Sequence, residues 1–132
     1  MTRTVIQTAQ APAPVGPYNQ AIAATGKMVF VSGQIALDPV TGELVGNGDV
    51  KAETEQVMKN LAAVLAAAGA TFEHVVKTTV FLADMGDFTK VNDIYAQSFN
   101  EKTAPARACV QAACLPKGVQ VEIECIAVIP EA

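Results

Sequence analysis

The sequence is short of positive charge and of long apolar runs, and each shortage argues against a class of protein. Nine Lys and Arg residues stand against 13 Asp and Glu residues, which gives a net charge of −4. A protein that binds nucleic acid without regard to sequence, or that lies on an anionic membrane, needs the opposite balance. The longest apolar run, residues 61–68, is far shorter than the roughly 20 residues of a membrane-spanning helix. We therefore expect neither nucleic acid nor a membrane as a partner.

Histidine and cysteine are also scarce. His74 is the only histidine, and no G-x-S-x-G motif accompanies it, so we expect a loop residue and no Ser-His-Asp triad. The three cysteines form no C-x-x-C pair and have no histidine nearby, which argues against a zinc site. An odd cysteine count in an apolar-rich chain is typical of reduced thiols. Residues 1–14 also lack the apolar segment of a secretory signal, so we expect a cytoplasmic protein.

The composition is that of one folded domain. The chain has 132 residues, of which 51% are hydrophobic and 17% charged, and disordered chains show the reverse pattern. We find no internal repeat, and the Pro- and Gly-containing stretch 11–16 is too short for a linker. Residues 1–132 are therefore expected to form a single domain.

Strand and helix signals alternate along the chain. Strand-forming runs lie at residues 4–8, 19–24, 28–32, 75–82, 106–113 and 119–128, and the second and third of these read as a hairpin around Gly26. Asp49 and Gly69 bound one predicted helix, and Asp87 caps another that extends towards Phe99. The apolar face of the first helix is expected to comprise Val50, Val57, Leu61, Val64, Leu65 and Ala68. This order predicts an α+β fold in which two helices cover one face of a mixed sheet.

Residue alternation assigns the faces of the last two strands. In residues 106–113 the apolar set Ala106, Ala108, Val110 and Ala112 is expected to face the core, and Arg107, Cys109 and Gln111 the other side. In the last strand Val119, Val121, Ile123, Cys125 and Ala127 form the core face. Its other face carries Gln120, Glu122, Glu124, Ile126 and Val128. Ile126 and Val128 would suit a partner surface, and the alternative is an exposed strand face with two solvated carboxylates.

Arg107 and a glutamate of the last strand are the candidate chemical groups. A guanidinium donates two parallel hydrogen bonds to a carboxylate, and a nearby carboxylate can orient or deprotonate water. We interpret the pair as the border of one polar pocket, which could lie where subunits meet, and the alternative is two ordinary surface residues. Cys109 shares the face of Arg107, whose charge could lower the thiol pKa, or it is a small strand hydrophobe. Gly42, Gly46 and Gly48 match no phosphate-loop motif and predict a turn-rich loop.

Five blocks of the sequence occur in the order of a known family: GPYNQA (residues 16–21), VSGQI (31–35), residues 75–95, PARACV (105–110) and LPKGVQVEIECIAV (115–128). Together they resemble the reactive-intermediate deaminase A (RidA, or YjgF) family over nearly the whole chain. The resemblance implies a chorismate-mutase-like fold and a homotrimer with three active sites between subunits. It also implies hydrolysis of 2-imino acids to 2-keto acids and ammonia. These imines arise from enamines such as 2-aminoacrylate, which pyridoxal-phosphate enzymes release, and would otherwise damage other enzymes.

The resemblance also implies roles for single residues and a reaction that needs no metal or cofactor. Arg107 is expected to pair with the substrate carboxylate, and Glu122 to position the attacking water. Tyr18, Ser32, Asn92 and the backbone of Gly33 resemble pocket residues, and Cys109 resembles a residue that often lines the site. The sequence departs from the family at Ala104, where Phe is frequent, and at Ala108, where Ser is common. A smaller residue at position 104 could widen the pocket.

Three other functions stay open at this level. The first is a ligand-sensing or regulatory trimer that holds a 2-keto acid without turnover, and the presence of Arg107 counts against it. The second is RNA cleavage, which is also attributed to this family and which the acidic composition and single histidine disfavour. The third is a chaperone activated by modification of Lys or Cys, on which the sequence says almost nothing.

Overall fold

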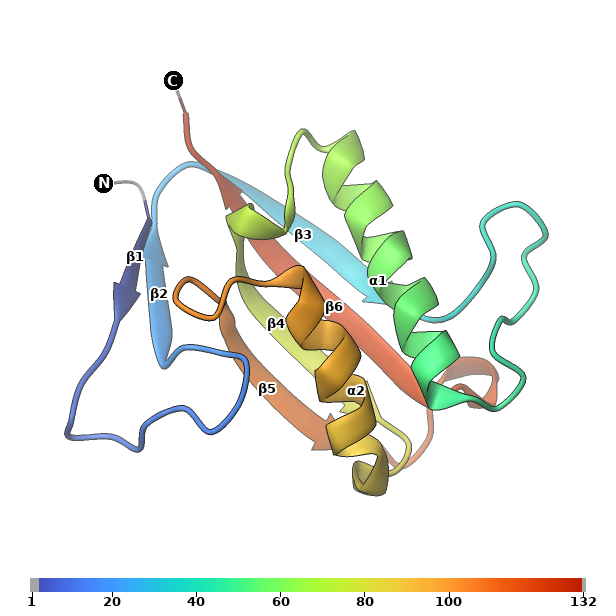
Figure 1. Cartoon of the computed structure of the whole chain (residues 1–132). Helices are drawn as coiled ribbons and strands as arrows, with labels where there is room; N and C mark the ends of the chain where they lie inside the picture. Colours follow the sequence, from blue (N-terminus) through green and yellow to red (C-terminus); the bar gives the residue numbers. More distant parts are fainter. Residues whose placement is uncertain (1–2, 132) are drawn as a thin grey trace.

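A four-stranded mixed sheet organises the molecule, which was analysed as a computed structural model that describes residues 3–131 (Figure 1). The strand order is β3-β6-β4-β5, with β3 at Lys27–Gln34, β6 at Val121–Ile129, β4 at Val75–Leu82 and β5 at Ala106–Gln111. Strands β4 and β5 are parallel, and β6 is antiparallel to both β3 and β4. Strands β1 (Arg3–Ile6) and β2 (Ala21–Ala24) form a separate antiparallel pair.

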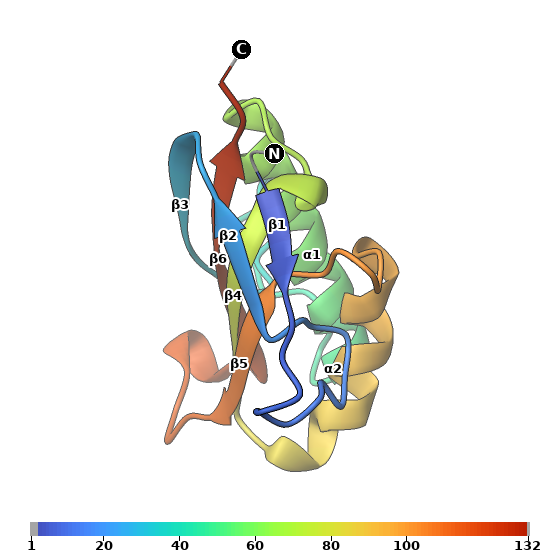
Figure 2. The same ribbon diagram turned by 90° about the vertical axis from the view of Figure 1, so that its left-hand side faces the viewer.

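Two α-helices, α1 (Val50–Ala67) and α2 (Phe88–Tyr95), lie on the same side of this sheet, as the edge-on view in Figure 2 shows. The parallel β4–β5 pair needs a crossover, and α2 supplies it. The predicted α+β class, with two helices on one face of a mixed sheet, is confirmed. None of the helices in the described part of the chain is long and apolar enough to cross a membrane.

Helix α1 begins and ends as its sequence predicts. The Asp49 side chain accepts a hydrogen bond from the Lys51 amide at 2.9 Å. At the other end, Gly69 adopts a φ of +82°, and the Ala70 amide donates to the Leu65 carbonyl at 2.8 Å. This is a Schellman motif, in which glycine accepts a left-handed conformation at little cost. The predicted core positions Val57, Leu61 and Leu65 are buried. The prediction for Val64 is wrong, because its side chain is exposed.

Helix α2 is shorter than its apolar pattern suggests. It ends at Tyr95 and continues as a 3₁₀ turn over Ala96–Ser98. Val91 and Tyr95 are fully buried, and Phe88, Ile94 and Phe99 pack against the core. Asp87 occupies the N-cap position as predicted, but its side chain makes no capping hydrogen bond.

The predicted hairpin between residues 19–24 and 28–32 is wrong. Strand β2 pairs with β1, while β3 leaves the turn at Gly26 to pair with β6. Gly26 has a φ of +146° and lies directly against the Ile129 carbonyl group, so a side chain there would collide with the backbone of the β6 end. The chain therefore passes from one sheet to the other at this glycine.

The predicted orientation of β5 is also wrong. In β4, Thr78 is buried and its hydroxyl bonds that of Tyr95 on α2 at 2.7 Å, so this position faces the helices. Arg107 is the register partner of Thr78, so Arg107 and Cys109 lie on the helix side. Ala108 and Val110 instead lie on the opposite face of the sheet and are exposed.

The face of the sheet that carries no helix is called the open face here. Its exposed apolar side chains are Met28, Phe30 and Val110, at 56%, 69% and 45% of their full exposure. The predicted core face of β6 is confirmed, since Val121, Ile123, Cys125 and Ala127 are buried. Glu122, Glu124, Ile126 and Val128 therefore point to the open side, although Val128 is already buried within the single chain. A sheet face of this composition is typical of one that another protein surface covers.

Candidate active site

Arg107 lies at the edge of the helix layer, inside a group of aromatic rings. Its guanidinium carbon is 5.0 Å from the ring centre of Tyr95, 5.4 Å from that of Tyr18 and 5.6 Å from that of Phe88. Helix α2 provides Tyr95 and Phe88, and the loop before β2 provides Tyr18. The negative faces of aromatic rings attract a cation, so the three rings hold the guanidinium in place.

The charge of Arg107 meets no carboxylate in the described part of the chain. Its hydrogen-bond partner there is the neutral Asn92 amide, whose Oδ1 accepts from Nη1 at 2.5 Å. Tyr95 does not offset the charge either, because burial raises its pKa to about 12 and the phenol stays protonated. A guanidinium carries five N–H donors, and most of them remain for a ligand. The site is therefore arranged to bind an anion.

The loop that carries Tyr18 is attached to the segment before β5. The buried Asn19 side chain donates to the Ala104 carbonyl at 2.8 Å, and the Asn19 amide donates to the Pro105 carbonyl at 3.2 Å. Tyr18 accepts from the Val15 amide at 3.3 Å. Gly16 lies so close to Nη2 of Arg107 that a Cβ atom there would be 3.3 Å from it. These contacts set the position of Tyr18 relative to Arg107.

Cys109 follows Arg107 on the same face and is half-buried. Burial raises the pKa of the Cys109 thiol, and the Arg107 charge lowers it by less. The sequence left open a lowered thiol pKa or a small strand hydrophobe, and the raised pKa agrees with the second. Cys109 therefore borders the arginine as a neutral thiol.

Glu122 forms a second group on the open face, together with Gly33 and the exposed Ser32. The pairing of β3 with β6 is irregular between Val31 and Gln34, and the Glu122 side chain lies against Gly33 at this point. A Cβ atom on residue 33 would collide with the Glu122 carboxylate. Glycine at position 33 therefore leaves room for this carboxylate.

Arg107 and Glu122 do not meet within one chain. Arg107 is aligned with Thr78 of β4, and Glu122 is aligned with Phe81, three residues further along that strand. Positions an odd number of residues apart point to opposite faces of a sheet. The pocket expected from these two residues is therefore absent from the single chain. The arginine half-site (Arg107, Asn92, Tyr18 and Cys109) and the glutamate half-site (Glu122, Gly33 and Ser32) are separate.

Several residues that surround Arg107 or position Tyr18 were not predicted as site residues from the sequence. Phe88 and Tyr95 were expected only as core residues of the second helix, and their contact with Arg107 depends on how α2 lies over β5. Gly16 and Asn19 lie in the block that also contains Tyr18, which was the one available signal. His74, expected as a loop residue, accepts a hydrogen bond from the Thr71 amide through Nδ1 at 3.0 Å and stabilises a short turn.

Comparison with known proteins gives the family. The model of the family described as "Endoribonuclease L-PSP" matches residues 8–129. A RutC family protein from Synechocystis is 63% identical, and the alignment covers 98% of this chain and 99% of the relative. The human 2-iminobutanoate/2-iminopropanoate deaminase is 49% identical over 97% of this chain and 91% of that protein. The crystal structure of E. coli TdcF with bound serine superimposes with a TM-score of 0.72 at 44% identity, over 96% and 98% of the two chains. The chain belongs to the RidA/YjgF family, whose model bears the name endoribonuclease L-PSP.

Proposed function

We propose that this protein hydrolyses small 2-imino acids, such as 2-iminopropanoate and 2-iminobutanoate, to 2-keto acids and ammonia. The observation that carries the proposal is Arg107, a guanidinium fixed by three rings and one neutral amide without a carboxylate partner among the described residues. The substrates of such a reaction are carboxylates. Relatives at about half identity bear the name of this deaminase, which supports the assignment.

The proposed site contains residues of two copies of the chain, in a homotrimer with three sites between subunits. A single copy holds its arginine and glutamate half-sites on opposite faces of the sheet. Its open face exposes Met28, Phe30 and Val110, which a second copy would cover. Contact between the open face of one copy and the β5 edge of the next would bring Glu122 of one towards Arg107 of the other.

In this site Arg107 binds the substrate carboxylate through two parallel hydrogen bonds. Asn92 and the rings of Tyr18, Phe88 and Tyr95 hold the guanidinium, so little conformational freedom is lost on binding. The carboxylate then fixes the position of the neighbouring C2 carbon, which carries the imine.

Glu122 acts on the water. It accepts a proton as the water oxygen bonds to C2, the C=N electron pair moves to nitrogen, and the nitrogen takes up a proton. When the resulting carbinolamine collapses, Glu122 returns its proton to the amino nitrogen, the C–N bond breaks and ammonia leaves, while the C2–OH gives its proton to water and becomes the carbonyl of the keto acid. Imines hydrolyse in water without a catalyst, so positioning by Arg107 and Glu122 suffices for the modest acceleration required.

The experiment is hydrolysis of freshly generated 2-iminopropanoate, with semicarbazide present to trap the imine that survives. We expect the native protein to reduce semicarbazone formation and Arg107→Ala to restore it. If neither protein changes the trapping rate while the native protein binds pyruvate tightly, the deaminase proposal is wrong and a ligand-sensing function replaces it.

A further inference from the structure

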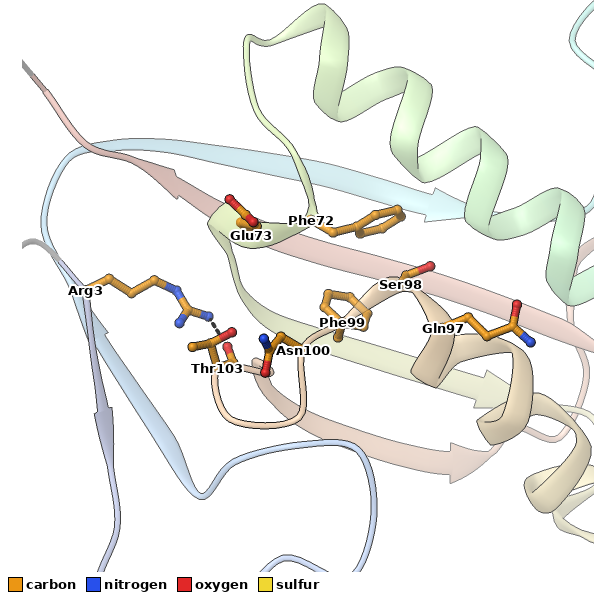
Figure 3. A pocket seen from close by; sticks show the side chains of 8 residues that line it. All are labelled: Arg3, Phe72, Glu73, Gln97, Ser98, Phe99, Asn100 and Thr103. Carbon is orange, nitrogen blue, oxygen red and sulfur yellow. Dashed lines mark hydrogen bonds between the residues drawn. The ribbon is translucent and has the colours of Figure 1, made fainter.

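One cavity in the described part of the molecule shares no lining residue with either half-site. It has a volume of about 560 Å³ and lies on the helix side, between the first residue of β1, the turn that precedes β4 and the segment that follows α2 (Figure 3). Its lining residues are Arg3, Phe72, Glu73, Gln97, Ser98, Phe99, Asn100 and Thr103.

Arg3 supplies a positive charge, and its hydrogen-bond partners within residues 3–131 are neutral carbonyl groups. Its Nη2 donates to the carbonyl oxygens of Val75 at 2.9 Å and Thr103 at 2.7 Å. Its Nε is buried and has no hydrogen-bond partner within residues 3–131. Burial accordingly lowers the pKa of Arg3 from its ordinary value. A half-buried guanidinium that hydrogen-bonds only neutral groups among the described residues is an anchor for an anion, above all a carboxylate.

Hydrogen-bond donors and a carboxylate lie together at the Arg3 end of the cavity. Asn100 uses its Oδ1 to accept from the Lys102 amide at 2.9 Å, which leaves the Nδ2 donors for the cavity. In Figure 3 the Asn100 side chain lies beside Thr103 and near the guanidinium of Arg3, and Glu73 lies at this end as well. This end therefore combines donors suited to a carboxylate with one carboxylate suited to an ammonium group.

The middle of the cavity is aromatic. Phe72 and Phe99 meet edge to face, with ring centres 5.2 Å apart and planes at 71°. Both rings are only partly buried, and they lie between the Arg3 end and Gln97. An apolar or aromatic side chain placed here would cover them and gain the free energy of apolar burial.

We propose that this cavity binds a free amino acid with an apolar or aromatic side chain. The carboxylate contacts Arg3 and Asn100, the ammonium group contacts Glu73, and the side chain lies along Phe72 and Phe99. Phe99 also packs against Tyr95, with ring centres 4.8 Å apart, and Tyr95 lies under Arg107. The occupied cavity is thus connected to the arginine half-site through two rings.

Calorimetric titration of the full chain with L-phenylalanine tests the proposal. Two partial ligands are titrated in the same way: 3-phenylpropionate lacks the ammonium group, and phenethylamine lacks the carboxylate. Backbone amide NMR shifts locate the binding. We expect a Kd of about 1 mM or lower for phenylalanine and shifts at Arg3, Phe72, Phe99 and Asn100. Both partial ligands should bind at least about tenfold more weakly, since each loses one charged contact.

Asn100→Asp is the informative variant, because it keeps the acceptor for the Lys102 amide and replaces the Nδ2 donors with a charged oxygen. We expect it to weaken phenylalanine binding at least about tenfold. Lys51→Gln, which makes the same change in net charge at an exposed position of α1, should bind normally. No binding at about 20 mM phenylalanine, or equal binding by Asn100→Asp, would overturn the proposal. Equal affinity for 3-phenylpropionate would remove the role of Glu73 and with it the assignment to an amino acid.

Discussion

Arg107→Lys separates the charge of Arg107 from its shape. The lysine ammonium keeps the positive charge beside the three rings but cannot donate two parallel hydrogen bonds to one carboxylate. It also loses the planar geometry in which Nη1 donates to Asn92 at 2.5 Å while the other donors point elsewhere. If Arg107 served only as a point charge, lysine would replace it with little loss.

The size of the effect follows from the bond that is lost. A hydrogen bond between charged groups contributes about 1.5 to 3 kcal/mol, and each 1.4 kcal/mol is about a factor of ten. We therefore expect kcat/KM for 2-iminopropanoate to fall by about 10- to 100-fold. Most of the loss should lie in KM, because the substrate carboxylate is bound both before and during the reaction.

The semicarbazide assay at several imine concentrations measures both constants. Lys90→Arg, the reverse exchange at an exposed position of α2, is the control and should behave as the native protein. Retention of native kcat/KM by Arg107→Lys would refute the carboxylate clamp, whatever the activity of the protein.

Four further predictions concern Glu122, the open face and the thiols. Gly33→Ala should reduce kcat at least about tenfold, because the new methyl group displaces the Glu122 carboxylate; an unchanged kcat would contradict this. Phe30→Asp should give a folded monomer without deaminase activity, since a charge at this 69% exposed position opposes contact between copies. Sedimentation measures the oligomeric state and circular dichroism the folding. An active trimer would refute the role of the open face. At pH 8, iodoacetamide should react fastest with Cys114, because its thiol is exposed. Cys109 should react more slowly, because burial raises its pKa. Cys125 should react only on unfolding, because its thiol is buried and burial raises its pKa to about 11. Since the unfolded thiol ionises near 9, the Cys125 contribution to stability should fall between pH 9 and 11, and a urea titration that shows stability rising over this range would contradict the buried thiol.

The local signals in the sequence predicted most of the fold. Asp49, Gly69 and the spacing of Val57, Leu61 and Leu65 act within one helix, so their meaning does not depend on distant residues. The order of strands and helices then leaves few arrangements other than two helices on one face of a mixed sheet.

Errors arose where a distant element decides the outcome. The alternating alanines and Val110 of β5 read as a core face, yet the helix side of this strand receives Arg107, because Tyr18, Phe88 and Tyr95 surround the guanidinium. The expected hairpin failed for a similar reason, since β6 is the partner of β3 and the Ile129 carbonyl group meets Gly26.

Some of the candidate residues named from the sequence lie together in the structure, while their roles stay predictions. Arg107, Asn92 and Tyr18 do come together, as do Glu122 and Gly33. That the two groups lie on opposite faces follows from the register of β4 with β5 and β6, which no single segment of sequence contains.

Subunit complementation tests the two-copy site most directly. Arg107→Ala and Glu122→Gln are each expected to be inactive, and the two proteins are refolded together in equal amounts. If each site takes Arg107 from one copy and Glu122 from the next, about one quarter of the sites in randomly mixed trimers receive both intact residues. The account therefore predicts recovery of about one quarter of native activity. Activity that stays at the level of the separately refolded variants would show that both residues act from the same copy, and would contradict the account.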